Sequence, residues 1–129
     1  MAPELVALAL AGLLQVVQYG LYSVAANRQV GVEYALGPRD EGRKLSDIPQ
    51  RLQRAMSNHF EGLILFTLAV VVIEQSGANS TLTAGCAWAY LAARVVYIPA
   101  YAYAWVPWRS VIWAVGFLST VVMIAVALV

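Results

Sequence analysis

The chain has 129 residues, of which 61% are hydrophobic and 12% are charged, and its mean hydropathy is +0.70. Soluble domains carry about 25% charged residues, so this composition excludes an ordinary soluble domain and predicts a small integral membrane protein. The net charge of +1 gives no support for a nucleic-acid partner, because such a protein needs a clustered basic surface beyond the membrane.

The first predicted transmembrane helix covers residues 3–26. It is too long for the apolar part of a signal peptide, and Glu4 stands where a signal peptide would have basic residues. We therefore expect this helix to be retained in the protein. A polar stretch with several glycines and Pro38 follows and predicts a loop.

Three more helices are predicted after this loop. Ser46 or Asp47 can cap the second helix, and Pro107 can open the fourth. We place these helices at residues 47–74, 81–104 and 107–128. The predicted fold is all-α, an integral membrane four-helix bundle that forms a single transmembrane domain over residues 1–129.

The positive charges are distributed asymmetrically in this four-span arrangement. The side opposite to them holds Glu4 and Glu74 and no positive charge. By the positive-inside rule, the basic side is cytoplasmic and both termini lie on the non-cytoplasmic side. All eight Lys and Arg residues fall in or near the basic side: Arg28, Arg39, Arg43, Lys44, Arg51, Arg54, Arg94 and Arg109.

A polar face precedes the apolar part of the second helix. The apolar run 62–73 covers only ~18 Å at ~1.5 Å per residue, whereas the hydrocarbon core is ~30 Å thick. Arg54, Asn58 and Glu61 therefore lie at or below the headgroup level, where a charge is expensive unless it faces protein or water. Their i, i+4, i+7 spacing places them on one face of the helix.

The third helix carries a matching polar stripe. Arg94, Tyr97 and Tyr101 stand at i, i+3, i+7 in its cytoplasmic half. One interpretation is a structural network, in which Glu61 neutralises an arginine and Asn58 bonds across helices. The other is an anionic ligand, because several arginines gather at one depth with Glu61 as their only acidic neighbour.

His59 is the only histidine of the chain and has no Cys or acidic partners at ligand spacing, so no metal site is predicted. A small transporter is disfavoured because the helices show no broken central segment and no inverted repeat.

Two motifs resemble one membrane protein family. The stretch "RAMSNHFEGLILF" is similar to the R-A-x-x-N-x-x-E signature of the membrane-associated proteins in eicosanoid and glutathione metabolism (MAPEG). The stretch "ARVVYIPAYAYAWVPWRS" is similar to that family's A-R-x-x-Y-x-x-x-Y pattern followed by an R-S pair. The resemblance covers essentially the whole chain. It implies a homotrimer of four-helix bundles that binds glutathione between subunits near the cytoplasmic face.

The resemblance also implies roles for single residues. Arg54 would pair with a carboxylate of glutathione, Glu61 would accept from its amino group, and Arg109 would steady the thiolate as the catalytic residue. The other candidate binding residues are Arg28, Asn58, Arg94, Tyr97, Tyr101 and Ser110.

The implied function is a membrane-embedded glutathione-dependent transferase or peroxidase. Glutathione would be the co-substrate, and its thiolate would attack a lipophilic electrophile that arrives from the membrane lipid. Ser57 and Gly62 depart from the residues of the mammalian prostaglandin and leukotriene synthases. The chain looks like a bacterial member of the family, which implies the inner membrane. Membership leaves enzyme status open, and the alternative is a noncatalytic lipid-binding or assembly protein of the same fold.

Overall fold

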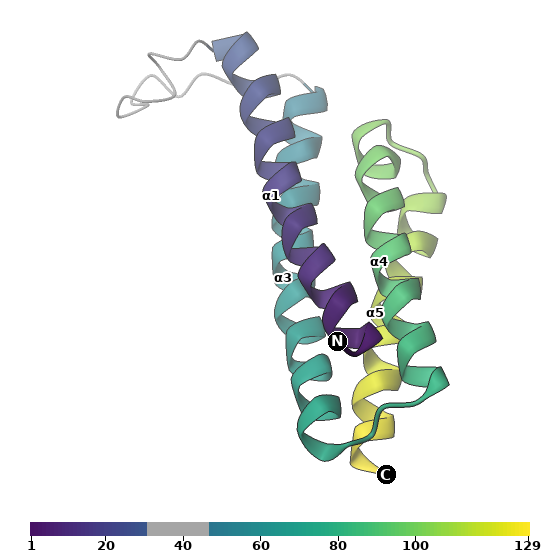
Figure 1. Ribbon diagram of the computed structural model, residues 1–129. Coiled ribbons are helices and arrows are strands. Elements are labelled where there is room, and N and C mark those ends of the chain that lie inside the picture. Colours follow the sequence, from purple (N-terminus) through teal and green to yellow (C-terminus); the bar gives the residue numbers. More distant parts are fainter. Residues whose placement is uncertain (31–46) are drawn as a thin grey trace.

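The computed structural model describes residues 1–30 and 47–129, and these residues form four helices and no strand. The helices run up and down side by side (Figure 1). Each is long and apolar enough to cross a membrane. The predicted all-α membrane four-helix bundle is therefore confirmed. The helices are α1 (Pro3–Val30), α3 (Asp47–Ser76), α4 (Thr81–Ala102) and α5 (Trp108–Leu128).

The helix ends follow from local signals in the sequence. Ser80 caps α4 in a capping box, in which Thr83 N–H donates to Ser80 Oγ (3.2 Å) and Ser80 N–H donates to Thr83 Oγ1 (2.8 Å). Gly77, with a φ of 70°, supplies the left-handed residue that ends α3. Ala104 also has a positive φ of 53°, which explains why α4 ends at Ala102 and not at the predicted residue 104.

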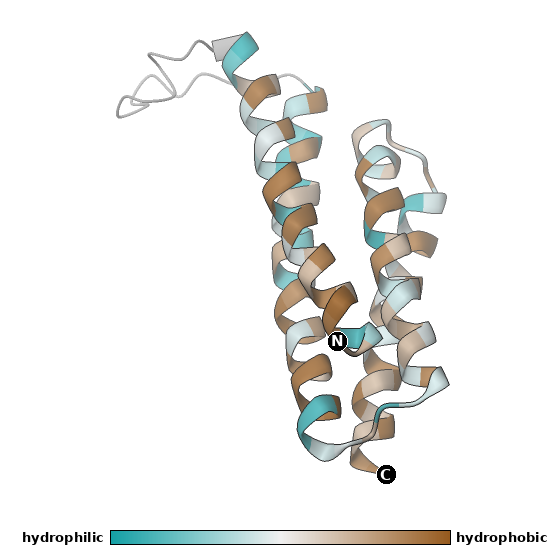
Figure 2. Ribbon diagram, viewed as in Figure 1, coloured by the Kyte–Doolittle hydropathy of each residue, from teal (hydrophilic) through white to brown (hydrophobic). Residues whose placement is uncertain are grey.

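The first helix packs against the bundle through small and polar residues, not through its large apolar ones. Its large apolar side chains, such as Leu13, Val16 and Val17, are exposed, and a bilayer would solvate them. Figure 2 shows the predominance of hydrophobic residues along this helix. Small residues on the inner side let α1 approach its neighbours closely, which is the usual packing in membranes. The buried residues of α1 are Glu4, Ala7, Ala11, Gln15, Gln18 and Ala26.

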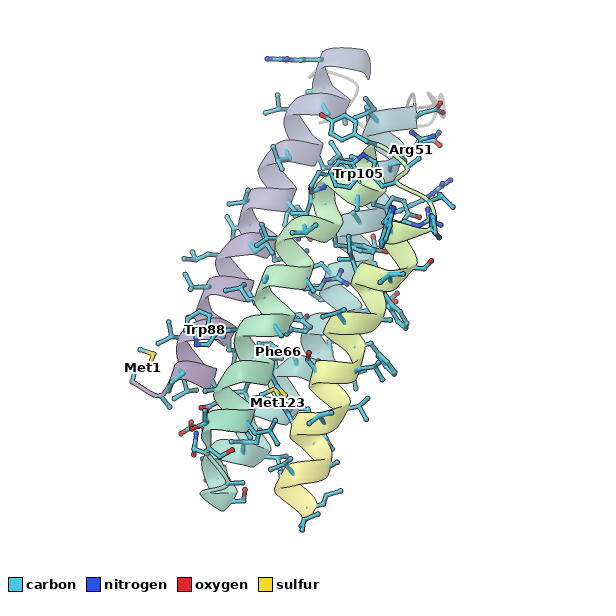
Figure 3. All side chains as sticks on the ribbon, turned by 90° about the vertical axis from the view of Figure 1, so that its right-hand side faces the viewer. Met1, Arg51, Phe66, Trp88, Trp105 and Met123 are labelled. Atoms are coloured by element: carbon cyan, nitrogen blue, oxygen red, sulfur yellow. The ribbon has the colours of Figure 1, made fainter. Side chains whose placement is uncertain are left out.

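The apolar core lies where all four helices meet. Phe66 of α3 stacks on Tyr90 of α4 with ring centroids 4.0 Å apart, and Met123 of α5 is fully buried in the same cluster. Figure 3 shows Phe66 and Met123 between the helices, whereas Arg51 and Trp105 lie at one end of the bundle. Aromatic stacking and complete burial make this cluster the close-packed core of the bundle.

The two ends of the bundle differ in charge. Arg28 ends α1, Arg54 lies near the start of α3, and Arg109 lies in the first turn of α5, so these arginines share one end (Figure 1). Arg39, Arg43 and Lys44 fall outside the described residues. We call this the basic end.

The opposite end holds Glu4 and Glu74, joined by Asn79. Asn79 Nδ2 donates to Glu4 Oε1 (3.2 Å), Glu4 Oε2 (3.1 Å) and Glu74 Oε1 (2.7 Å). One amide thus holds the start of α1 against the turn between α3 and α4. We call this the acidic end.

Membrane orientation gives the first testable prediction. We expect a reporter fused within residues 37–43 to read cytoplasmic, and reporters fused at Asn79 or Val129 to read external, because the positive charges gather at the other end. Paired alkaline phosphatase and fluorescent protein fusions would measure this. The fusion loop lies outside the described residues. A cytoplasmic carboxyl terminus would contradict the assignment.

Candidate functional site between α3, α4 and α5

The basic end contains a cavity of about 290 Å³ lined by three helices. Asn58 comes from α3, Tyr97 and Tyr101 come from α4, and Arg109, Ser110 and Trp113 come from α5. Because residues three, four or seven apart share a helix face, each helix presents its polar residues to the same space. We call this space the polar cavity.

Two arginines and two tyrosines form a column beside this cavity. The guanidinium carbon of Arg109 lies 4.8 Å from the Tyr101 ring centroid, and that of Arg94 lies 4.4 Å from the Tyr97 ring centroid. The two tyrosine rings meet edge to face, with centroids 5.6 Å apart. Cation–π contacts of this kind fix the orientation of a guanidinium while its N–H groups stay available to a ligand.

The Arg94 guanidinium is buried and has no counter-charge in an ion pair with it among the described residues. The side chain is only 3% exposed, and its Nε and Nη2 atoms have no hydrogen-bond partner among the described residues. A buried charge without a partner is strongly unfavourable, so buried arginines normally have a carboxylate or another anion beside them. The Nε and Nη2 atoms of Arg94 therefore need a negative charge or hydrogen-bond acceptors that the described residues do not provide.

A second cavity of about 170 Å³ adjoins the polar cavity, because Asn58 and Trp113 line both. The buried Oδ1 atom of Asn58 has no partner in the described part of the chain. The walls of this second space are mainly apolar, and we call it the apolar cavity. Its other lining residues are Glu61, Gly62, Leu65, Arg94, Phe117 and Thr120.

The structure brings most of the predicted site residues together. Asn58, Tyr97, Tyr101, Arg109 and Ser110 line the polar cavity, and Arg94 and Glu61 line the apolar one.

Two predicted residues lie apart from both cavities in the single chain. Arg54 is exposed on the outer surface of α3, and Arg28 is exposed near the end of α1. Neither lines either cavity. Arg51 is held elsewhere, because its Nη1 donates to the Ala102 carbonyl oxygen (3.4 Å) at the end of α4. Any ligand contact of Arg54 or Arg28 therefore needs a second chain or a ligand that reaches out of the polar cavity.

Two residues of the site were not predicted from the sequence. Trp113 stands one turn after Arg109, and the i, i+4 spacing could have indicated it. Tyr90 stands one turn before Arg94, and its buried hydroxyl has no partner among the described residues. A side chain built on Gly62 would meet that hydroxyl at 3.5 Å, so Tyr90 OH points toward the wall of the apolar cavity.

The structural-network interpretation expected two contacts that are not formed among the described residues of a single chain. Glu61 forms no ion pair with an arginine, and Asn58 Oδ1 bonds to no neighbouring helix among residues 1–30 and 47–129.

The comparisons with known proteins agree with the motifs. A model of the MAPEG family matches residues 3–129, which is essentially the whole chain. No curated protein and no solved structure matches it.

Proposed function

Because this chain belongs to the MAPEG family, we propose that it is a membrane-embedded glutathione-dependent transferase or peroxidase. It would activate the glutathione thiolate toward a lipophilic electrophile. The observation that carries the proposal is Arg94, a buried guanidinium with two N–H-bearing atoms that have no partner among the described residues. Arg94 lines the apolar cavity, which adjoins the polar cavity lined by Arg109.

The charge balance of the site favours an anionic ligand. Arg94 and Arg109 supply two positive charges, while Glu61 is the only carboxylate from the described residues that lines either cavity. Glutathione carries two carboxylates, an ammonium group and a thiol, so it offers acceptors to the arginines and a donor to Glu61. Asn58, Tyr97 and Ser110 can bond to its peptide groups.

Thiol activation is assigned to Arg109. A thiol with a pKa of about 8.5 is mostly protonated at neutral pH, and a guanidinium held near the sulfur favours the thiolate. Tyr101 fixes that guanidinium from the other side (4.8 Å). The electrophile would occupy the apolar cavity beside Leu65 and Phe117, so positioning and charge would supply the catalysis.

Calorimetry of glutathione on the purified protein tests the proposal. We expect binding in the millimolar range or tighter, and Arg54→Ala should weaken it by ~1.5–3 kcal/mol through loss of a charge-assisted hydrogen bond. Arg51→Ala is the matched control, because Arg51 lies one turn away but donates to the Ala102 carbonyl oxygen. It should leave the affinity unchanged. If the wild-type protein binds no glutathione, the noncatalytic lipid-binding or assembly alternative wins.

We further propose that the protein is a homotrimer whose sites lie between subunits. Arg54 and Glu61 are exposed on α3 although this helix spans the membrane. A charge that faces lipid at this depth costs ~2.5–3.5 kcal/mol, so another protein surface should cover both residues. Arg54 would then reach a ligand in the polar cavity of a neighbouring subunit, as would Arg28.

Native mass spectrometry in a mild detergent measures this assembly. We expect a trimer, and we expect Glu61→Gln to retain it, since the amide avoids the cost of a bare charge. Arg54→Glu should weaken it, because this change places two carboxylates on the same covered surface. A wild-type protein that remains monomeric would remove the basis for sites between subunits.

The membrane itself is the remaining partner. Lipid would contact the exposed apolar surfaces and deliver the electrophile. We propose the bacterial inner membrane as the location, with the basic end in the cytoplasm and both termini outside. No nucleic acid takes part in this function.

A further inference from the structure

The wall of the apolar cavity lacks a side chain at Gly62. This residue belongs to α3 and lines the cavity between Asn58 and Leu65. Among the described residues, the only atom of another helix within 4 Å of a Cβ built on Gly62 is Tyr90 OH, at 3.5 Å. That distance is ordinary van der Waals contact, so the packing of the helices does not require glycine here. The missing side chain leaves its volume to the cavity.

The apolar cavity runs along the bundle from a polar end to an apolar end. Asn58 and Trp113, which also line the polar cavity, lie at the first end. Leu65 and Thr120 lie seven residues further along α3 and α5, which corresponds to ~10 Å of helix. Thr120 Oγ1 donates to the Gly116 carbonyl oxygen (3.0 Å), so this hydroxyl has a partner within its own helix. A bound molecule would therefore place its reacting atom toward Asn58 and its apolar body toward Leu65.

Aromatic side chains form one wall of this cavity. Trp113 and Phe117 stand one turn apart on α5, and their rings stack with centroids 5.0 Å apart and planes 10° apart. Both line the cavity from α5, whereas Gly62 lines it from α3. Aromatic rings attract other aromatic rings in stacked or edge-to-face arrangements. This wall therefore suits a planar ring better than a flexible chain.

The volume of the cavity also matches a single ring. It is about 170 Å³, and an apolar protein cavity of ~150 Å³ is enough to bind benzene. A long acyl chain, with many more carbons than a six-membered ring, exceeds this volume. Arg94 lines the same cavity, so its positive charge lies where negative charge would develop on a ring attacked by a thiolate. Size and charge thus favour the same kind of ligand.

We propose that the apolar cavity is a binding site for one flat aromatic ring, and that Gly62 makes the room for it. As a statement about specificity for aryl electrophiles, this inference rests on the proposed function. With an activated aryl chloride, the thiolate sulfur forms a bond to the ring carbon, the carbon–chlorine bond breaks, and chloride leaves with the electron pair. The proton of the thiol has already passed to solvent. The step needs no oxidant and no third reactant.

Two substitutions at Gly62 should narrow the cavity in steps. Alanine adds one methyl group. Leucine adds a side chain that leans toward the N-terminal end of its helix, over Asn58, where the two cavities adjoin. Both residues form helices more readily than glycine, so we expect both variants to fold.

A ratio of two reaction rates tests the role of Gly62. We would compare kcat/KM for a dinitro-substituted chlorobenzene with kcat/KM for iodomethane, which is too small to need the cavity but uses the same thiolate. One methylene in an apolar pocket changes specificity by ~10–200-fold, so Gly62→Ala should lower this ratio about 10-fold and Gly62→Leu about 10²-fold. Gly85→Ala and Gly85→Leu are the matched controls, because Gly85 is exposed on α4 and lines neither cavity. An aryl-to-methyl ratio that does not respond to Gly62 would contradict the proposal.

A second experiment does not depend on glutathione. Crystals of the wild-type protein soaked with iodobenzene should show the anomalous signal of iodine between α3 and α5, beside Gly62 and Trp113. Crystals of Gly62→Leu should lack this signal. A wild-type cavity without the signal, or one filled by a neighbouring subunit, would overturn the proposal. If the signal appears in a protein that binds no glutathione, the ring site stands and the proposed transferase function fails.

Discussion

Replacing Arg109 by alanine should lower the turnover of glutathione with a lipophilic aryl halide by about 10²–10³-fold, the usual effect of losing a group that stabilises developing negative charge. Arg109 lines the polar cavity and lies 4.8 Å from the Tyr101 ring, so its guanidinium has a fixed position. Without it, the bound thiol keeps its proton at neutral pH. Thiolate absorbance of the complex and kcat should therefore fall together.

The matched control for this prediction is Arg109→Lys. Lysine keeps the charge but loses the planar group that lies over Tyr101, so partial recovery of thiolate absorbance is expected. Glutathione affinity should change far less than turnover, because the carboxylates of the ligand have other partners. Undiminished thiolate absorbance in Arg109→Ala would remove this residue from the catalytic role.

Replacing Arg94 by leucine should stabilise the unliganded protein and abolish glutathione binding. Removing a buried charge that has no carboxylate partner in the described part of the chain should raise the free energy of unfolding by ~1–4 kcal/mol, the range seen when buried ionic groups are replaced by apolar ones. The lost cation–π contact with Tyr97 opposes this gain by about 2 kcal/mol at such a desolvated site. We therefore expect a net stabilisation from the upper part of the range, about 2 kcal/mol.

Thermal unfolding with and without glutathione measures both effects. The wild-type midpoint should rise with glutathione, because a ligand that binds only the folded state stabilises that state. The midpoint of Arg94→Leu should be higher than that of the unliganded wild-type protein and should not change when glutathione is added. Arg51→Leu is the control at an arginine with a protein partner, the Ala102 carbonyl oxygen, and it should lower the midpoint. If Arg94→Leu lowers the midpoint, and glutathione changes the midpoint of neither protein, then Arg94 stabilises the fold and does not bind the ligand.

The fold could be predicted from the sequence because a membrane constrains it so strongly. Four apolar segments of spanning length admit few arrangements, and the positive charges, such as Arg28 and Arg109, gather at one end while the end with Glu4 and Glu74 has no Lys or Arg. The resemblance to the MAPEG family, carried by two motifs, is confirmed by the family match over residues 3–129.

The site was only partly predictable, because spacing along one helix says nothing about the neighbouring helix. Arg54, Asn58 and Glu61 share a face of α3, yet Asn58 lines both cavities whereas Arg54 lies on the outside. The two residues differ in their position along the helix axis, because Arg54 lies a full turn nearer the basic end than Asn58. The place of Tyr90 depends in the same way on which helix packs opposite.

The buried face of α1, which includes Ala7 and Ala11, determines which substitutions this helix tolerates. In a water-soluble bundle, large apolar residues are constrained and outward positions vary freely in polarity. Here Leu13, Val16 and Val17 face outward and can be exchanged for any other lipid-soluble side chain. Ala7 and Ala11 are fully buried, so a larger residue at either position would push α1 away from α3 and α4. In a deep mutational scan of this helix, we therefore expect apolar substitutions that change side-chain size to be tolerated on the lipid-facing side. The same changes of size should impair the protein on the buried side with Ala7 and Ala11.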